Sequence, residues 1–321
     1  MAHVRAATKE AMMKQRRLRS CLSAATTAAL LVLAAPPVGA HEDEEGTERE
    51  ELNSRRPEAW TMRHFAAATQ STGVSAPISR RLGSFELGLE TDSIPYLSAA
   101  QRTVGFNGTK EEDLNRTPVI ARPHAAIGLG RGFSLVADWV PPIRVHGSTA
   151  NVVTVALERP LLQTDTWTIG ARVGAGSGRL RGDFTCPQAA AAAGDDPVRN
   201  PSQCLRASDD VQSYHWKNVA VVVSHALTPS LQAYASASLW KQDAIFRVHA
   251  LLEDEEDQDR LAFAGSDRGA ALGLDWSRGL WHVGTEVFYS PLDVIRDPSG
   301  RGPSERDDFW NIRLKTSYRF R

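Results

Sequence analysis

The sequence predicts an all-β protein, an antiparallel transmembrane barrel of about ten strands. Three observations support this fold. Short runs of alternating apolar and polar residues fill the chain from residue 81 onward, their connections alternate between short and long, and tryptophans lie near the ends of the apolar runs. Alternation with a period of two gives each strand one apolar face and one polar face. A barrel strand crosses a bilayer with about 9–11 tilted residues, which is the typical length of these runs.

The last twelve residues, 310–321, show the alternation most clearly. One parity is mainly apolar and the other carries the charges Arg313, Lys315 and Arg319. We expect the apolar parity to face lipid and the charged parity to face the lumen. We also expect this strand to pair with the first strand, near residues 84–90, and so close the barrel. The apolar parity consists of Trp310, Ile312, Leu314, Thr316, Tyr318 and Phe320.

Ten runs qualify as barrel strands, because each is bounded by turn residues such as glycine, proline and serine. A further hairpin at residues 96–107 would raise the number to twelve. The expected strands are residues 84–90, 122–130, 133–139, 151–158, 166–176, 214–227, 231–240, 268–276, 280–289 and 310–321.

The connections separate a membrane barrel from a soluble β-sandwich. The short ones are residues 130–132, 159–165, 228–230 and 277–279, and the long ones are 91–120, 140–149, 179–213, 242–266 and 291–307. Membrane barrels have short turns on one side and long loops on the other. A sandwich has more uniform connections and hides its large apolar residues between two sheets. The observed alternation favours the barrel.

The N-terminus predicts export. A basic stretch (14–20), an apolar stretch (21–37) and small residues at 38–40 form a signal peptide over residues 1–40, with an uncleaved anchor as the alternative. Residues 41–80 are expected to be a flexible periplasmic segment, because 41–56 are almost wholly polar. Within it, residues 57–80 admit a short helix or an inward-folded plug. The barrel is assigned to residues 81–321.

Two cysteines, Cys186 and Cys204, remain after the signal peptide is removed. An even pair in an exported chain predicts a disulfide. It would close a polar surface loop and stabilise the fold by on the order of 3 kcal/mol.

Charged residues on the inward parity are the candidate functional residues. Both signs occur, so we expect a structural network of ion pairs, since an unpaired charge in a narrow lumen is costly. An anion-selective lining built on Arg172, Arg313 and Lys315 is the alternative. The predicted lumen-lining residues are Glu86, Arg122, His124, Asp138, Arg172, Asp275, His282, Glu286, Arg313 and Lys315.

Other functional classes find less support. The net charge of −1 argues against a nucleic-acid partner. Asp209, Asp210 and His215 lie near the expected outer rim, but their spacing is not diagnostic. Ser224 and His225 are neighbours in a strand and point to opposite faces. We therefore assign no catalytic residue, cofactor or metal site, and expect the protein not to be an enzyme.

The C-terminal "SYRFR" is similar to the targeting signal of Gram-negative outer-membrane β-barrel proteins, although here Phe320 is followed by Arg321. The resemblance covers a general class. It implies an outer-membrane location, contact with the lipid bilayer and lipopolysaccharide, and recognition of the last strand by the barrel-assembly machinery. The expected function is a structural or narrow pore role for small solutes. The alternatives are a surface-interaction barrel acting through its long loops and an outer-membrane hydrolase.

Overall fold

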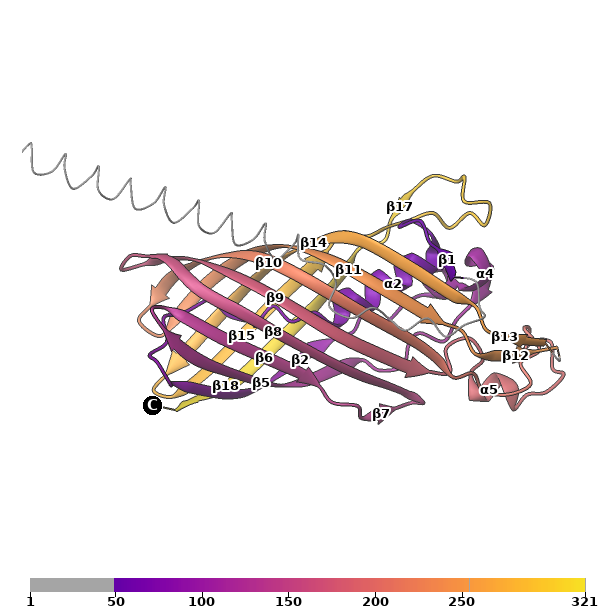
Figure 1. The fold of residues 1–321 in the computed structure, drawn as a ribbon, viewed down its shortest axis with the longest axis horizontal. Coiled ribbons are helices and arrows are strands. Elements are labelled where there is room, and N and C mark those ends of the chain that lie inside the picture. Colours follow the sequence, from indigo (N-terminus) through magenta and orange to yellow (C-terminus); the bar gives the residue numbers. More distant parts are fainter. Residues whose placement is uncertain (1–48, 254, 321) are drawn as a thin grey trace, which may run out of the picture.

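The structure is a computed structural model that describes residues 49–253 and 255–320 (Figure 1). The predicted signal peptide, residues 1–40, and residues 41–48 lie outside this part of the chain. No helix among the described residues has the length and hydropathy needed to cross a membrane.

Ten antiparallel strands of the described chain form a closed barrel, as the sequence predicted. Each strand pairs with the next along the chain, and the last pairs with the first through Phe320 and Phe85. The predicted closure and the fold class are therefore confirmed. The strands are β2 (Phe85–Ser93), β5 (Val119–Gly130), β6 (Phe133–Val140), β8 (Ser148–Gln163), β9 (Trp167–Gly182), β10 (Asp210–Thr228), β11 (Leu231–Arg247), β14 (Arg260–Arg278), β15 (Trp281–Ser290) and β18 (Phe309–Phe320).

The two ends of the barrel differ. Short turns and the end of β18 lie at one end, here called the inner end, and the long loops lie at the other, the outer end (Figure 1). In a membrane barrel the short turns are periplasmic. The outer loops carry the short elements β3 (Thr103–Val104), β4 (Lys110–Glu111), β7 (Arg144–Val145), β12 (Ala250–Leu252), β13 (Glu255–Asp257), β16 (Asp293–Val294), β17 (Glu305–Arg306), α3 (Ala99–Arg102), α4 (Gly105–Gly108) and α5 (Gln188–Ala191). Residues 96–107 therefore form short loop elements and no additional barrel strands.

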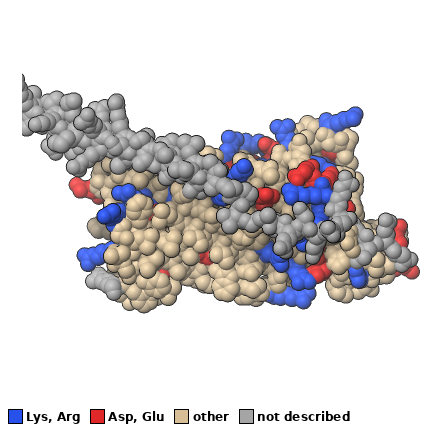
Figure 2. Space-filling model, viewed as in Figure 1, with Lys and Arg blue, Asp and Glu red and all other residues tan. Residues whose placement is uncertain are grey.

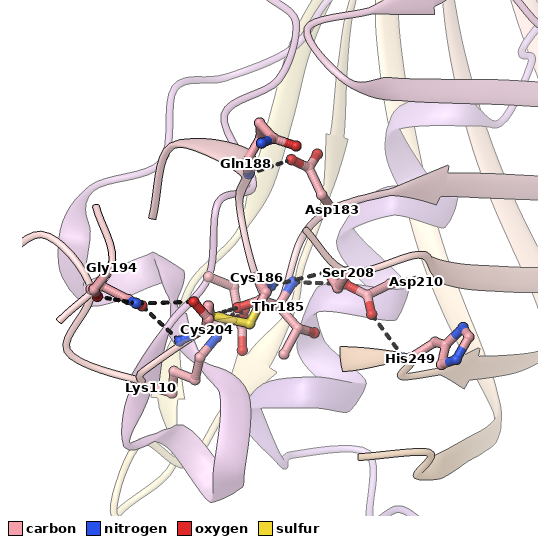
Figure 3. Close-up of a disulfide and its surroundings, with 12 residues drawn as sticks. Lys110, Asp183, Thr185, Cys186, Gln188, Gly194, Cys204, Ser208, Asp210 and His249 are labelled. Atoms are coloured by element: carbon pink, nitrogen blue, oxygen red, sulfur yellow. Dashed lines mark hydrogen bonds and ion pairs between the residues drawn. A yellow bond between two sulfur atoms is a disulfide. The ribbon is translucent and has the colours of Figure 1, made fainter. Parts of the chain in front are cut away.

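One side of the barrel is taller than the other. Strands β8, β9, β10, β11 and β14 have 16, 16, 19, 17 and 19 residues. The other five have between 8 and 12. The tall side carries the loop closed by the disulfide between Cys186 and Cys204, which confirms the predicted bond (Figure 3). Beside it, the Asp210 carboxylate accepts hydrogen bonds from the amides of Thr185 and His249.

The outer surface of the barrel wall is apolar. Leu272 and Trp310 on this face are 69% and 56% exposed, which a water-facing sheet would avoid. Trp139 and Trp310 lie toward the outer end, and Trp167, Trp276 and Trp281 lie toward the inner end. These positions correspond to the aromatic girdles at the two membrane interfaces. On the face shown in Figure 2, the middle of the wall is mainly uncharged, and charged side chains gather toward the ends.

The described N-terminal segment occupies the barrel interior from Pro57 onward. Strand β1 (Arg49–Glu51) pairs in parallel with the outer end of β14. Helix α2 (Pro57–Thr69) follows, and nearly all of its residues are buried. Residues 70–84, here called the strap, then lead to β2 at the inner end. Helix α2 and the strap together are called the plug. Over its described part, this path differs from the flexible segment expected for residues 41–80, and residues 57–80 form the helix and inward-folded plug that the sequence admitted, because the barrel wall buries them.

Candidate functional site: the plugged lumen

All ten predicted lumen-lining residues point into the barrel and are at most 4% exposed. The lumen that they line is occupied by the plug, so these side chains contact protein. They are Glu86, Arg122, His124, Asp138, Arg172, Asp275, His282, Glu286, Arg313 and Lys315.

Four cationic side chains of the wall hold the backbone of the plug. An extended segment without a strand partner leaves its carbonyl groups unpaired, and buried carbonyls need donors. The wall cations supply these donors to the last residue of α2 and to the first half of the strap. The hydrogen bonds run from Arg122 Nη1 to Thr69 O (2.9 Å), Arg313 Nη1 to Gln70 O (2.9 Å), Lys315 Nζ to Gly73 O (2.6 Å) and Arg172 Nη2 to Ser75 O (3.3 Å).

Negatively charged carboxylates of the wall also bind the strap, through its side chains. Ser71 Oγ donates to Asp138 at 2.7 Å, and Thr72 Oγ1 donates to Glu286. Arg80, on the strap, pairs with Glu86 at 2.7 Å. Because both ends of the strap are bound by side chains from several strands, its position depends on many separate polar contacts.

The same charged residues also pair along the wall. Arg172 lies 2.9 Å from Glu158, and Glu86 accepts a hydrogen bond from Arg319 at 2.7 Å. His124 Nδ1 lies 2.7 Å from an oxygen of Asp138. These contacts give the charges of both signs partners, as expected of a structural ion-pair network. They leave Arg172, Arg313 and Lys315 engaged with the plug, unlike the open anion-selective lining considered as the alternative.

Two wall glycines make room for the strap. A Cβ atom at Gly284 would lie 2.2 Å from Val74 O, and one at Gly128 would lie 2.0 Å from Arg81 O. Real Cβ contacts do not come this close, so any larger residue at either position would displace the strap. The strap therefore packs directly on the backbone of the wall.

Helix α2 is held mainly by apolar packing, with a few polar contacts along its length. Trp60 belongs to a cluster with Trp240, Phe288 and Phe309, and its indole donates to Asp307 O at 2.9 Å. Arg63 lies 2.6 Å from Asp267 of β14. At the end of the helix, the Thr69 hydroxyl lies 2.6 Å from the Tyr214 hydroxyl. The helix thus fits an interior that is apolar on most sides.

His64 on α2 is buried between aromatic rings near the outer rim. Its ring centroid lies 5.1 Å from that of Trp60 and 5.0 Å from that of Phe309. Its Nδ1 atom has no hydrogen-bond partner among the described residues. Burial lowers the pKa of His64 to about 4, with Asp307 partly opposing the shift. The neutral imidazole is therefore the form that the packed helix accommodates.

A closed barrel with an apolar exterior and a buried, paired polar interior has the properties required of a strand-built membrane protein. The fold is that of an outer-membrane β-barrel. No family model and no curated protein matches the chain.

Three solved structures illustrate the likeness of fold. They are the outer membrane protease OmpT from Escherichia coli (10% identity, 74% of this chain and 94% of that chain, TM-score 0.39), Ail, the attachment invasion locus protein of Yersinia pestis (11%, 74% and 99%, 0.29), and the toluene transporter TbuX of Ralstonia pickettii (12%, 75% and 90%, 0.30). At these scores the likenesses carry no argument about activity.

One group of wall residues has donor atoms close enough for a metal ion. Ligand atoms of Glu90, His124 and Asp138 lie within 4.8 Å of one another. Arg122 Nε lies 3.6 Å from Glu90, and the Asp138 carboxylate already binds His124 and Ser71. The arrangement therefore fits an ion-pair network, in which the guanidinium supplies the positive charge.

The interior of the barrel also contains a serine, a histidine and an aspartate in contact. Ser317 Oγ lies 3.3 Å from His282 Nδ1, and His282 Nε2 pairs with Asp275. Ser317 also donates a hydrogen bond to Glu86 at 2.9 Å and is 2% exposed. A nucleophile needs access to its substrate. The burial of Ser317 prevents that access while the plug is in place.

The other residues considered for catalysis are separated. Asp209 forms an exposed ion pair with Arg181, and Asp210 organises the disulfide loop. The side chain of His215 belongs to the opposite parity of β10 from the buried Tyr214. These positions do not converge on one site.

Sequence reasoning did not find the plug residues that complete the site, namely Arg63, Ser71, Thr72 and Arg80. One signal was available for the helix. Pro57 stands at its first position and an alanine-rich stretch follows, which is typical of a helix start and a good helix former. The strap has no periodic pattern that would indicate its partners.

Proposed function

We propose that this protein is a sealed outer-membrane barrel that passes small solutes when the strap leaves its position. The observation that carries the proposal is the set of wall cations bound to the carbonyl groups of residues 69–75. A hydrogen bond to a charged group contributes only about 1.5–3 kcal/mol net, so each contact can be exchanged for water or solute. A seal built from such contacts is reversible.

The barrel size limits what passes. Ten strands enclose little more space than side chains fill, and helix α2 occupies the outer part. Moving the strap opens the inner part of a narrow, polar path lined by the residues predicted from the sequence, and solutes would then pass between α2 and the wall at the outer end. Small polar solutes fit this path better than large or apolar ones, because its walls carry buried charges that would be hydrated on opening.

The test is conductance in planar bilayers. We compare the native chain with a variant in which residues 70–82 are replaced by a glycine–serine linker of equal length, which keeps α2 tethered. The native barrel is expected to be closed for most of the recording, and the variant is expected to give discrete, long openings. A folded variant, with its disulfide and β-sheet signal intact, that stays silent at high protein load contradicts the proposal.

A surface-interaction role is the second candidate. It is favoured by the tall side of the barrel, where five long strands carry the loop stapled by Cys186 and Cys204 (Figure 3). Shortening residues 187–203 to a tight turn would abolish binding to cell-surface or matrix preparations while leaving the barrel folded. Unchanged binding would contradict this role.

The lipid and assembly partners expected from the sequence are also proposals. Lys241 of β11 and Arg268 of β14 face outward just beyond the apolar residues Leu239 and Ala270, and neither has a carboxylate partner among the described residues. The phosphate groups of lipopolysaccharide would bind there by charge. The exposed aromatic Phe320 supports recognition of the last strand by the assembly machinery.

A further inference from the structure

A cavity of about 170 Å³ lies at the outer end of the barrel, between helix α2 and the outer loops. Its lining comes from α2, the hairpin β3–β4, the start of the disulfide loop and the outer ends of β10, β11 and β14. About half of the lining side chains are apolar, and they supply most of the surface that faces the cavity; among them are Met62, Phe65, Val104, Leu114, Phe184 and Phe246. A comparably sized apolar cavity of about 150 Å³ holds a one-ring aromatic molecule.

One buried polar group in this lining lacks a partner. Gln212 is 0% exposed, and its Nε2 donates to Met62 O at 3.3 Å. Its Oε1 atom has no hydrogen-bond partner among the described residues. A buried acceptor without a donor is costly, so a donor group that reached Gln212 Oε1 would be stabilised there.

The other polar groups around the cavity are already engaged. Glu58 binds Arg56 and the backbone amide of Asn107, and the Thr61 hydroxyl donates to Pro57 O. Water in a cavity needs two to four polar partners. The unpartnered amide oxygen offers one, and the charged lining residues Arg56, Glu50 and Glu112 are held in ion pairs. A water molecule is therefore poorly satisfied there.

We propose that this cavity binds a small, mainly apolar molecule that carries a single hydroxyl donor. The ring or hydrocarbon part would fill the apolar space, and the hydroxyl would donate to Gln212 Oε1. A charged ligand is disfavoured, because the charged lining residues Arg56, Glu58 and Glu112 already pair with opposite charges of the protein.

The site contacts the plug directly, since Met62 and Phe65 belong to α2. A bound molecule would therefore stabilise the helix in its place. Binding does not require passage through the barrel, so this inference goes beyond the proposed transport function. Its test can fail while the conductance result stands, and the reverse also holds.

The experiment is titration calorimetry on the full chain in detergent, with phenol and anisole as probes and empty micelles as the blank. The two probes share a ring, and only phenol has a hydroxyl donor. The native protein is expected to bind phenol more tightly than anisole by on the order of ten-fold, the equivalent of one hydrogen bond.

Two variants locate the site. Gln212→Leu should bind both probes equally, because it removes the acceptor and keeps the volume. Val104→Phe should abolish binding by filling the cavity, while Val119→Phe, on the exposed outer face of β5, should bind as the native protein does. No phenol binding, equal binding of both probes by the native protein, a preference retained in Gln212→Leu, or full binding by Val104→Phe would each overturn the proposal.

Discussion

The two halves of the plug are held by different forces. In the outer half, α2 packs Trp60 and Met62 into apolar clusters with residues of several strands. In the inner half, the strap forms an extended path whose carbonyl groups bind Arg313, Lys315 and Arg172. The stabilisation from buried large apolar side chains is lost only when the whole helix leaves. Polar contacts can be exchanged one at a time.

We infer that the helix and the strap have different roles in the plug. The helix is the anchor of the plug, and the strap is its movable part. If this is correct, changes to the helix should remove the plug as a unit, and changes to the strap contacts should open the lumen while α2 stays in place. The following predictions are ordered by the size of the expected effect.

Trp60→Ala should have the largest effect. Trp60 is 1% exposed, and truncation of a buried aromatic side chain costs about 3–5 kcal/mol. The helix should detach, and protease sites within residues 57–84 should become accessible in the folded barrel. Truncation of the exposed Trp310, as Trp310→Ala, is the control and should leave the plug protected. A protected plug in Trp60→Ala would contradict the assignment of α2 as the anchor.

Gly284→Val should displace the strap, because even the first side-chain atom would collide with Val74 O. Overpacking of this kind costs roughly 1–3 kcal/mol. We expect frequent openings in bilayer recordings with α2 still resistant to protease. The neighbouring Thr285→Val, on the outward face of the same strand, adds the same side chain without this contact and should behave as the native protein does.

Lys315→Met removes the donor to Gly73 O and Ser75 Oγ without removing the hydrocarbon chain. Leaving a buried carbonyl unpaired costs about 1–3 kcal/mol. The expected result is a moderate rise in open probability, smaller than for Gly284→Val. Lys241→Met, on the exposed outer face, is the matched control. Equal open probabilities in the two lysine variants would argue that the hydrogen bonds from Lys315 do not hold the strap in place.

Mild acidification, to a pH of about 5.5, should weaken the anchor by on the order of 1 kcal/mol, because only the first pH unit below the ordinary histidine pKa is then used. The pKa of His64 is lowered to about 4 in the folded protein, so the unpacked helix binds a proton more readily. Stability from the neutral imidazole is present above the ordinary histidine pKa of about 6.5 and is lost as the pH falls toward 4. Protease resistance of α2 should decline over this range, and His64→Phe should remove that dependence. An identical pH profile in His64→Phe would exclude His64 as the cause.

The sequence was sufficient for the barrel wall because each strand carries its own signal. Alternation placed Lys315 and Glu286 on the inward face, and the spacing of turns placed the ten strands. The disulfide could also be predicted from the number of cysteines and the expected export of the chain alone. The alternation and the turns depend on residues that are close together in the sequence, so a single sequence is enough to identify them.

The plug could not be derived in the same way. Helix α2 is buried on nearly all sides, so it lacks the apolar stripe by which a surface helix is recognised. The contact of Lys315 with Gly73 spans 242 residues, and the pattern around Gly73 gives no indication of it. Glycines on the wall indicated a narrow lumen, but the segment that fills it is defined only by the three-dimensional arrangement.

Hydrogen–deuterium exchange on the native barrel tests the central claim most directly, because it compares the two halves of the plug in one sample. Local opening exposes amides without unfolding the protein. We predict that amides of the strap, residues 70–84, exchange well before those in the last two turns of α2, while the barrel strands stay protected. A strap as protected as the strands, or a helix that exchanges before the strap, would contradict the account.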